Sequence, residues 1–573
     1  MKILLNGTEI NDFCVKSGDF PQAATAEKYF REYVGKLTGK KVSGNAGEVK
    51  FVYDGASDDG FTVSLDKNAL TFSGGKRGVI YAVFEFLKKC GCRFFTPALE
   101  KYPTADVIFT DFTDRQLSPF LFRDVLSIYT SDKEWSLKNR LNSCLWNQRR
   151  FTEAEGGGWK FAGIPAHTLT GEFLLAPYAE THPEYFSLVD GKRMTDRMGQ
   201  VCMTSDEAVD AVAEEVKKLL VNNPDCNIVS VSMGDNKNFC TCEKCREKTA
   251  RVGLARAYYD FINAVAYKIY EYRPDVLVHT FAYMNLCDIG DEFALAPNIM
   301  IQYCTAGCAI HPIGGCEHNA DQAKNLAVWS KMCKNVFIWD YINCFKYELM
   351  DMPTVYNYPA NLRTFARNGV KGVFNEGAHD TAYDKNCGFV GMPELRGYLM
   401  SAAMWNPFMS DEEYQTHIDE FCAAFYGEGG KAAAEYVKLL YEYSRSSHAT
   451  YDCNGFETPC AVTNYIDKDK TTEFLSRAYA IVKPAVAAAK GEFVPRLEKI
   501  LIEITYYDLF HNMERTLESG TDEEKRTSYE KNEWLVRKLR ENDVRLTFWG
   551  KTGADQQKNL DPTVPPSKWD YNW

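Results

Sequence analysis

Between about residues 118 and 405, short apolar runs alternate with segments that have helical periodicity. The eight runs are mostly apolar along their whole length, which is typical of parallel strands buried on both faces. Alternation with helices over this length predicts a (β/α)8 barrel, with a doubly wound open sheet as the alternative. The predicted strands are Leu121–Leu126, Ser143–Asn147, Ile164–Leu169, Asn227–Met233, Val276–Tyr283, Asn298–Tyr303, Val336–Trp339 and Val370–Phe374.

The two flanks have different patterns. The N-terminal flank mixes helical and strand periodicity, and the C-terminal flank has helical periodicity only. The N-terminal elements are a helix at Ala23–Thr38, strands at Val49–Tyr53, Phe61–Leu65 and Leu70–Ser73, and a helix at Val79–Leu87. We therefore predict an α/β protein with a small α/β domain at 1–112, a barrel at 113–408 and an α-helical region at 409–573.

Composition and charge limit the classes of function that the protein can have. The net charge is −12 and no basic cluster occurs, which argues against a nucleic-acid partner. Aromatic residues make up 14% of the chain, as expected for a packed barrel core or for a cleft that stacks on sugar rings. No apolar run is long enough for a membrane span or a secretory signal, so we expect no membrane partner and a cytoplasmic location, with a removed signal as the alternative. The 19 cysteines are then mostly free thiols.

Carboxylates follow three of the predicted strands. Asp235 follows the fourth strand, Asp340 the seventh and Glu376 the eighth. Barrel enzymes place catalytic groups at the carboxyl ends of strands, and cleavage of a glycosidic bond ordinarily uses two carboxyl groups. Capping of the next segment is an equal alternative for Asp235, and an ion pair with arginine is one for Asp340. Glu376 has no such structural duty in the pattern.

Other polar and aromatic residues are expected at the same end of the barrel. We predict that they bind substrate, although a lone histidine such as His167 is more often structural. These candidates are Arg123, His167, Asn236, Tyr283, Trp339, Tyr341 and Asn375.

Two groups of cysteines are candidates for metal sites. Cys240, Cys242 and Cys245 form a C-x-C-x2-C motif, but zinc usually needs four ligands and no fourth is evident. We interpret these three as free or packed thiols, with structural zinc or a disulfide as alternatives. Cys304, Cys308, His311 and Cys316 follow the sixth strand without a known spacing, and we interpret them as a substrate loop in which His311 binds substrate. No metal or cofactor is expected.

Several motifs together resemble known glycosidases. The run from Arg77 to Leu87, followed by Gly91–Phe95, resembles the small domain that precedes the barrel in hexosaminidases and α-glucuronidases. The barrel segments are similar to glycoside hydrolase family 163, and together these resemblances cover about residues 50–425. The matching stretches are His182–Phe186 with Asp190–Arg193, Asp235–Asn236 with C-x-C-x2-C, Cys308–Pro312, Trp339–Tyr341, and Gly369–Gly372 leading to Glu376–Gly377.

This resemblance implies a retaining endo-β-N-acetylglucosaminidase that acts on N-glycans, with the substrate acetamide as a possible nucleophile. Glu376 and Asp235 would form the catalytic pair, with Asp340 in reserve. Hexosaminidases carry adjacent Asp and Glu residues after the fourth strand, whereas this chain has Asp235 and Asn236, so their site does not transfer unchanged. An inverting α-glucuronidase-like enzyme that uses Asp340 and Glu376 and holds a uronic acid with Arg123 is the alternative. A non-catalytic carbohydrate-binding protein is another.

Overall fold

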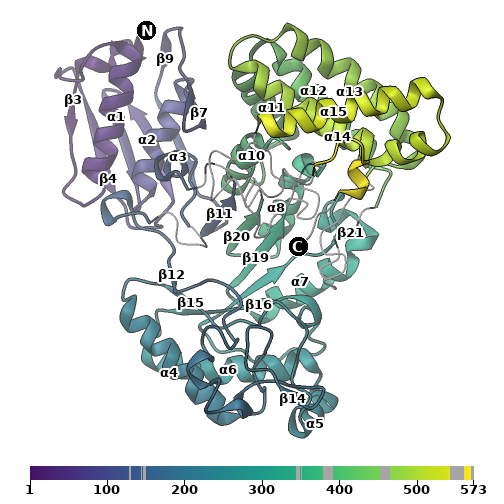
Figure 1. Cartoon of the computed structure of the whole chain (residues 1–573). Coiled ribbons are helices and arrows are strands. Elements are labelled where there is room, and N and C mark those ends of the chain that lie inside the picture. The colour runs from purple at the N-terminus through teal and green to yellow at the C-terminus, as the bar shows by residue number, and fades with distance from the viewer. Residues whose placement is uncertain are drawn as a thin grey trace.

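The structure is a computed structural model of the chain. It describes residues 1–127, 129, 131–143, 145, 150–342, 349, 352–377, 391–448, 450–451, 465–542 and 560–569. Figure 1 shows three parts: an N-terminal α/β part, a central part built on a parallel sheet, and a C-terminal group of helices beside it.

The N-terminal part packs two helices on a five-stranded sheet. The strand order is β10-β5-β6-β4-β3, and the helices bury an aromatic-rich core against it. The elements are β3 (Phe13–Lys16), α1 (Ala23–Thr38), β4 (Gly47–Tyr53), β5 (Phe61–Asp66), β6 (Ala69–Gly74), α2 (Gly78–Lys89) and β10 (Phe112–Gln116). The helices and strands predicted for this part are confirmed. Short strands flank it: β1 (Ile3–Leu5), β2 (Thr8–Glu9), β7 (Arg93–Thr96), β8 (Leu99–Lys101) and β9 (Val107–Phe109).

The central part is a curled sheet of seven parallel strands in the order β11-β20-β19-β17-β16-β15-β12. The first and last of these strands in the sequence, β11 and β20, lie side by side, as in a sheet that curls toward a barrel. The strands are β11 (Phe122–Leu126), β12 (Phe161–Ala162), β15 (Ile228–Ser230), β16 (Leu277–Ala282), β17 (Ile299–Cys304), β19 (Val336–Tyr341) and β20 (Gly372–Glu376). The predicted strands at these places, apart from the third, are confirmed.

Two predicted strands differ. The third was placed at Ile164–Leu169, but the strand is β12 and the residues after it form a loop, because Gly163 and His167 take positive φ angles that break an extended run. The second, Ser143–Asn147, lies mainly outside the described residues. Ser143 itself forms one parallel bridge with Trp159, between β11 and β12. Within the described residues the sheet is thus a curled half-barrel and not a complete ring of eight strands.

Side chains alternate between the two faces of the central sheet. Phe122, Phe337, Trp339 and Phe374 belong to a cluster on the inner face, whereas their neighbours Ile338 and Val373 join the outer core against the helices. The surrounding helices are α3 (Lys133–Lys138), α4 (Asp206–Asn222), α5 (Glu243–Val252), α6 (Leu254–Tyr272), α7 (Ala320–Met332), α8 (Tyr358–Arg367) and α10 (Pro393–Trp405).

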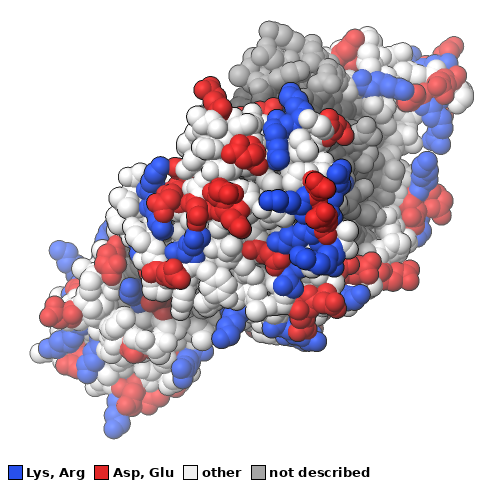
Figure 2. Space-filling model, turned by 90° about the horizontal axis from the view of Figure 1, so that it is seen from below, with Lys and Arg blue, Asp and Glu red and all other residues white. Residues whose placement is uncertain are grey.

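The C-terminal part consists of long helices, as predicted, packed on one another and on α10 (Figure 1). They are α11 (Asp411–Tyr426), α12 (Gly430–Ser444), α13 (Lys468–Ala488), α14 (Phe493–Ser519) and α15 (Asp522–Glu541). None of the helices in the described ranges has the length and apolar character to cross a membrane. On the face in Figure 2, acidic and basic side chains are interspersed, in keeping with the absence of a basic cluster in the sequence.

Candidate active site

Glu376 is the last residue of β20, and its side chain lies on the inner face of the sheet. It is 8% exposed, and the Trp339 indole Nε1–H donates a 2.6 Å hydrogen bond to its Oε2. Burial raises the pKa of the Glu376 carboxyl to about 8; the hydrogen bond from Trp339 opposes this rise and the nearby charge of Asp235 adds to it. Glu376 therefore keeps its proton at neutral pH.

Asp235 lies on the loop after β15, at the same carboxyl-terminal end of the sheet as Glu376. Unlike Glu376 it is exposed, and the Tyr283 hydroxyl donates a 3.2 Å hydrogen bond to its Oδ1. The structure thus brings together a buried, protonated carboxyl and an exposed carboxyl group that raises the pKa of the first. Pairs of carboxyl groups in such unlike environments are a common acid and base arrangement.

The loop that carries Asp235 is held by one side chain that the sequence did not indicate. The Gln200 amide donates to the backbone oxygens of Gly234 and Asn236 and to Asn236 Oδ1, each at 3.0 Å. Its Oε1 accepts the Gly234 N–H at 2.9 Å. Asn236, a predicted substrate ligand, is buried and engaged in this contact. Gln200 and Asn236 therefore hold the loop in place, and the Asp235 side chain faces solvent.

Asp340 does not join this pair. It follows Trp339 in β19 and so points to the outer face, where Thr305 donates a 2.7 Å hydrogen bond to its Oδ1. Burial raises the pKa of Asp340 to about 6, against the lowering effect of the Thr305 hydrogen bond. Asn375 also faces outward, because its amide contacts the Met404 sulfur at 3.5 Å on α10. Asp340 and Asn375 thus lie at the same end of the sheet as Glu376, as predicted. Their side chains, however, lie on the opposite face of the sheet.

Aromatic rings line the inner face near the two carboxyl groups. Phe281 lies 5.5 Å from the Trp339 ring and 6.3 Å from the Tyr283 ring, measured between centroids. His167 lies 5.4 Å from Phe281, and its Nδ1 contacts the Met233 carbonyl at 2.9 Å, which makes Nδ1 the protonated nitrogen. Tyr341 is half-buried beside Glu376, its register partner on the adjacent strand. Of the predicted substrate ligands, His167, Tyr283, Trp339 and Tyr341 are thus gathered around the carboxyl pair.

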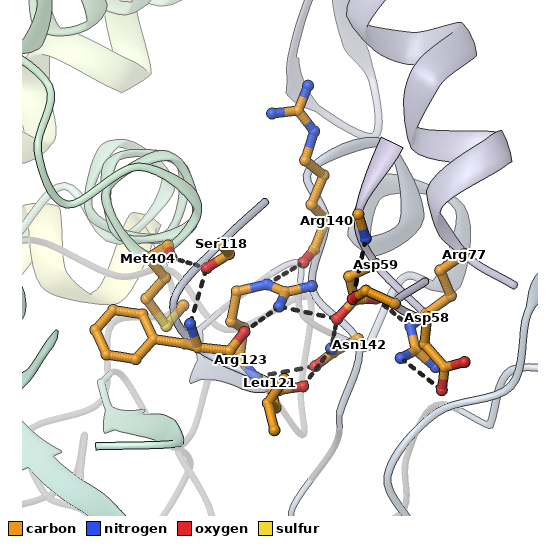
Figure 3. A network of polar contacts seen from close by, with 12 residues as sticks. Asp58, Asp59, Arg77, Ser118, Leu121, Arg123, Arg140, Asn142 and Met404 are labelled. Carbon is orange, nitrogen blue, oxygen red and sulfur yellow. Dashed lines mark hydrogen bonds and ion pairs between the residues drawn. The ribbon is translucent and has the colours of Figure 1, made fainter. Parts of the chain in front are cut away.

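Arg123 lies elsewhere, at the boundary with the N-terminal part (Figure 3). Its side chain is fully buried; it forms an ion pair with Asp59 Oδ2 at 3.1 Å, and its Nε donates to the Arg140 carbonyl. Arg77 holds the other Asp59 oxygen at 2.5 Å. The prediction that Arg123 holds a substrate is not supported by this position, because outward orientation on β11 directs the guanidinium away from the inner face.

Two groups of thiols and imidazoles could hold metal ions. Cys202 joins Cys240, Cys242 and Cys245, so the fourth ligand that the sequence did not reveal is supplied by a residue 38 positions before the motif. His311 lies in the second group with Cys308, Cys316 and His448. No spacing pattern links Cys202 or His448 to their groups, which is why sequence reasoning missed both. The sequence likewise contains no motif that indicates the roles of Gln200 and Thr305.

The chain belongs to the family described as domain of unknown function DUF4838, whose model matches residues 94–442. No curated protein is matched by this chain.

Solved structures of glycoside hydrolases share the fold at low sequence identity. A family 138 glycoside hydrolase that targets pectin rhamnogalacturonan II is 11% identical, with a TM-score of 0.55 over 99% of this chain and 77% of that one. A family 89 glycoside hydrolase from Clostridium perfringens, in complex with 2-acetamido-1,2-dideoxynojirimycin, is 12% identical, with a TM-score of 0.50 over 90% of this chain and 65% of that one. These similarities concern the fold and support no further identification. The specific resemblance to family 163 is not confirmed by them.

Proposed function

We propose that the protein is a glycoside hydrolase in which Glu376 is the general acid. The observation that carries this proposal is the buried Glu376 carboxyl, protonated at neutral pH, at a strand end among aromatic rings. A general acid works best when its pKa lies near the working pH, because the proton is then both present and readily transferred. The fold shared with glycoside hydrolases supports the same reaction class.

Asp235 is the second catalytic group in this proposal. Glu376 gives its proton to the glycosidic oxygen, and the aglycone leaves as an alcohol. In a retaining, substrate-assisted reaction the carbonyl oxygen of the sugar's 2-acetamido group then bonds to C1, while Asp235 orients the acetamide N–H. Water next attacks C1, the bond between C1 and the acetamide oxygen breaks, and the water transfers a proton to Glu376, which restores the starting state.

The substrate we propose is an oligosaccharide cleaved beside N-acetylglucosamine, most specifically an N-glycan cut by an endo-β-N-acetylglucosaminidase. The acetamido ligand held by the family 89 neighbour and the motifs that resemble those of family 163 support an N-acetylated sugar. Trp339, Tyr341 and Tyr283 would stack on the sugar faces, since aromatic rings pack on apolar surfaces.

The α-glucuronidase alternative has less support. It requires Asp340 beside Glu376 and a free cation such as Arg123 for the uronate. Asp340 lies on the other face of the sheet with Thr305, and Arg123 is bound to Asp59. An inverting reaction on a uronic acid is therefore disfavoured by geometry.

The test compares wild type with Glu376→Gln on N-glycans, chitooligosaccharides and aldouronic acids, with products followed by mass spectrometry. Glutamine keeps the shape but has no proton to donate, so we expect the rate to fall by about 100-fold or more. The anomeric configuration of the first product, observed by NMR, tests retention.

Glu503→Gln is the matched control. Glu503 on α14 is also buried, and burial raises its pKa to about 7, but its partner is Tyr436 in the C-terminal helices. We expect this variant to keep wild-type turnover. Equal turnover by Glu376→Gln and wild type would contradict the proposed acid, and glycan binding without turnover by wild type would favour a non-catalytic binding protein.

A further inference from the structure

We propose that the protein binds two structural zinc ions, one in a site of four cysteines and one in a site of two cysteines and two histidines. The first site consists of Cys202, Cys240, Cys242 and Cys245, and the second of Cys308, His311, Cys316 and His448. In each group the ligand atoms all lie within 4.8 Å of one another. This inference does not depend on the proposed function.

The four-cysteine group has the dimensions of a zinc site. Cys202 Sγ lies 3.8 Å from Cys242 Sγ and 3.8 Å from Cys245 Sγ. A tetrahedral zinc with Zn–S bonds of about 2.3 Å places its sulfurs about 3.8 Å apart. A disulfide would require a separation of about 2.05 Å, and these cysteines are free.

Hydrogen-bond donors surround the sulfur atoms of this group, as expected for metal-bound thiolates. The Leu188 N–H donates to Cys240 Sγ at 3.3 Å, and the Arg193 guanidinium lies 3.8 Å from the same sulfur. Thr204 Oγ1 lies 3.2 Å from Cys245 Sγ. Leu188 and Arg193 belong to the hairpin formed by β13 (Leu188–Val189) and β14 (Lys192–Arg193), so hydrogen bonds extend from the site to a neighbouring element.

The same site lies next to the loop of the proposed catalytic carboxylate. Cys202 is two residues after Gln200, which holds Gly234 and Asn236 on either side of Asp235. Cys240 is five residues after Asp235, and Cys242 is the residue before α5. A zinc ion bound here would therefore connect the segment that carries Gln200 to the loop that carries Asp235.

The second group has an independent argument. His311 Nε2 contacts the Arg445 carbonyl at 2.9 Å, and because a carbonyl only accepts, Nε2 carries the proton. Nδ1 is then the nitrogen that would bind a metal, and it lies 3.2 Å from Cys308 Sγ. Zinc-bound histidines commonly donate their other N–H in this way. His448 Nδ1 lies 3.8 Å from Cys308 Sγ and 3.7 Å from Cys316 Sγ.

This second site connects two parts of the chain. Cys308, His311 and Cys316 follow β17, whereas His448 comes after α12 of the C-terminal helices. The adjacent strands β18 (Gly307–Cys308) and β21 (Thr450–Tyr451) pair beside it. A zinc ion here would fasten the C-terminal helices to the central part of the chain.

The direct test is the zinc content of the full-length chain, purified without chelators and measured by elemental mass spectrometry. We expect about two zinc ions per wild-type chain and about one in Cys202→Ser or in His448→Ala. Cys226→Ser, a buried cysteine outside both groups, and His318→Ala, whose ring packs on His448, should each keep about two. Wild type without zinc, or variants with unchanged zinc, would overturn the proposal.

A second measurement needs no variant and avoids the risk of misfolding. Native wild-type protein is alkylated with and without a chelator, and the modified cysteines are mapped by peptide mass spectrometry. The partly exposed Cys242 and Cys316 should react only after chelation, whereas Cys14, which is also partly exposed but lies outside both groups, should react in both samples. Reaction of Cys242 and Cys316 without chelator, or their recovery as disulfides, would overturn the proposal.

Discussion

The raised pKa of Glu376 connects stability with activity. Burial favours the protonated carboxyl in the folded state, so the unfolded chain loses this proton near its ordinary pKa of 4.5 while the folded chain keeps it until about pH 8. Between these values the folded state binds more protons, and its stability falls as pH rises. Catalytic sites commonly lower the stability of the folded state in this way.

We therefore expect Glu376→Gln to be as stable as wild type near pH 4 and more stable at pH 8, by up to a few kcal/mol, since one pKa unit corresponds to about 1.4 kcal/mol. Urea unfolding at both pH values measures this difference. The wild-type rate should fall as pH rises through about 8, where the acid loses its proton. A stability difference that is the same at both pH values would contradict the assigned pKa shift.

The loop between β15 and α5 depends on Gln200, which touches it on both sides of Asp235. Gln200→Ala removes these hydrogen bonds without altering either carboxyl group. We expect kcat to fall by up to about 100-fold through misplacement of Asp235, while the decline of the rate near pH 8 stays in place.

The measurement is a pH–rate profile with kcat and KM determined separately. Gln22→Ala is the control, because Gln22, in the N-terminal part, is a similarly buried glutamine whose amide donates to the Glu153 backbone carbonyl. A shifted pH profile in Gln200→Ala would mean that Gln200 acts on Glu376 and not on the loop.

Elements with a clear apolar stripe could be predicted from sequence, and others could not. Helix α1 was predicted at its observed bounds, because its apolar residues recur on one face. Helix α5 was missed because Cys245 is its only buried residue, and it has no stripe to detect. The site was predicted in part: Glu376 and Asp235 follow from strand ends. The strands are apolar on both faces, however, and sequence does not reveal which face Asp340 or Arg123 occupies.

At the scale of the whole molecule, one buried carboxylate of the N-terminal part, Asp59, pairs with an arginine of the central sheet, Arg123. Asp59 lies between Arg77 and Arg123 and also accepts a 2.8 Å hydrogen bond from Asn142 (Figure 3). Against the effect of burial, the two arginines lower the pKa of Asp59. The ionised aspartate is thus the counterion of two buried cations.

We expect Asp59→Asn to lower the free energy of unfolding by about 3–5 kcal/mol, because it leaves buried charges uncompensated. Asp58→Asn is the control: Asp58 pairs with the same Arg77 at 3.6 Å but is 54% exposed, so its loss should cost less than about 1 kcal/mol. Denaturant unfolding followed by circular dichroism measures both. Equal effects of the two substitutions would show that the buried pair adds nothing beyond a surface contact.

The position of Arg123 also bears on how such chains can be recombined. The arginine lies in the first strand of the central sheet, but its counterion belongs to the N-terminal part. A chimera that joined this sheet to another N-terminal partner would leave a buried cation without its anion. The two parts are therefore not interchangeable modules, and an exchange between relatives has to carry the arginine and the aspartate together.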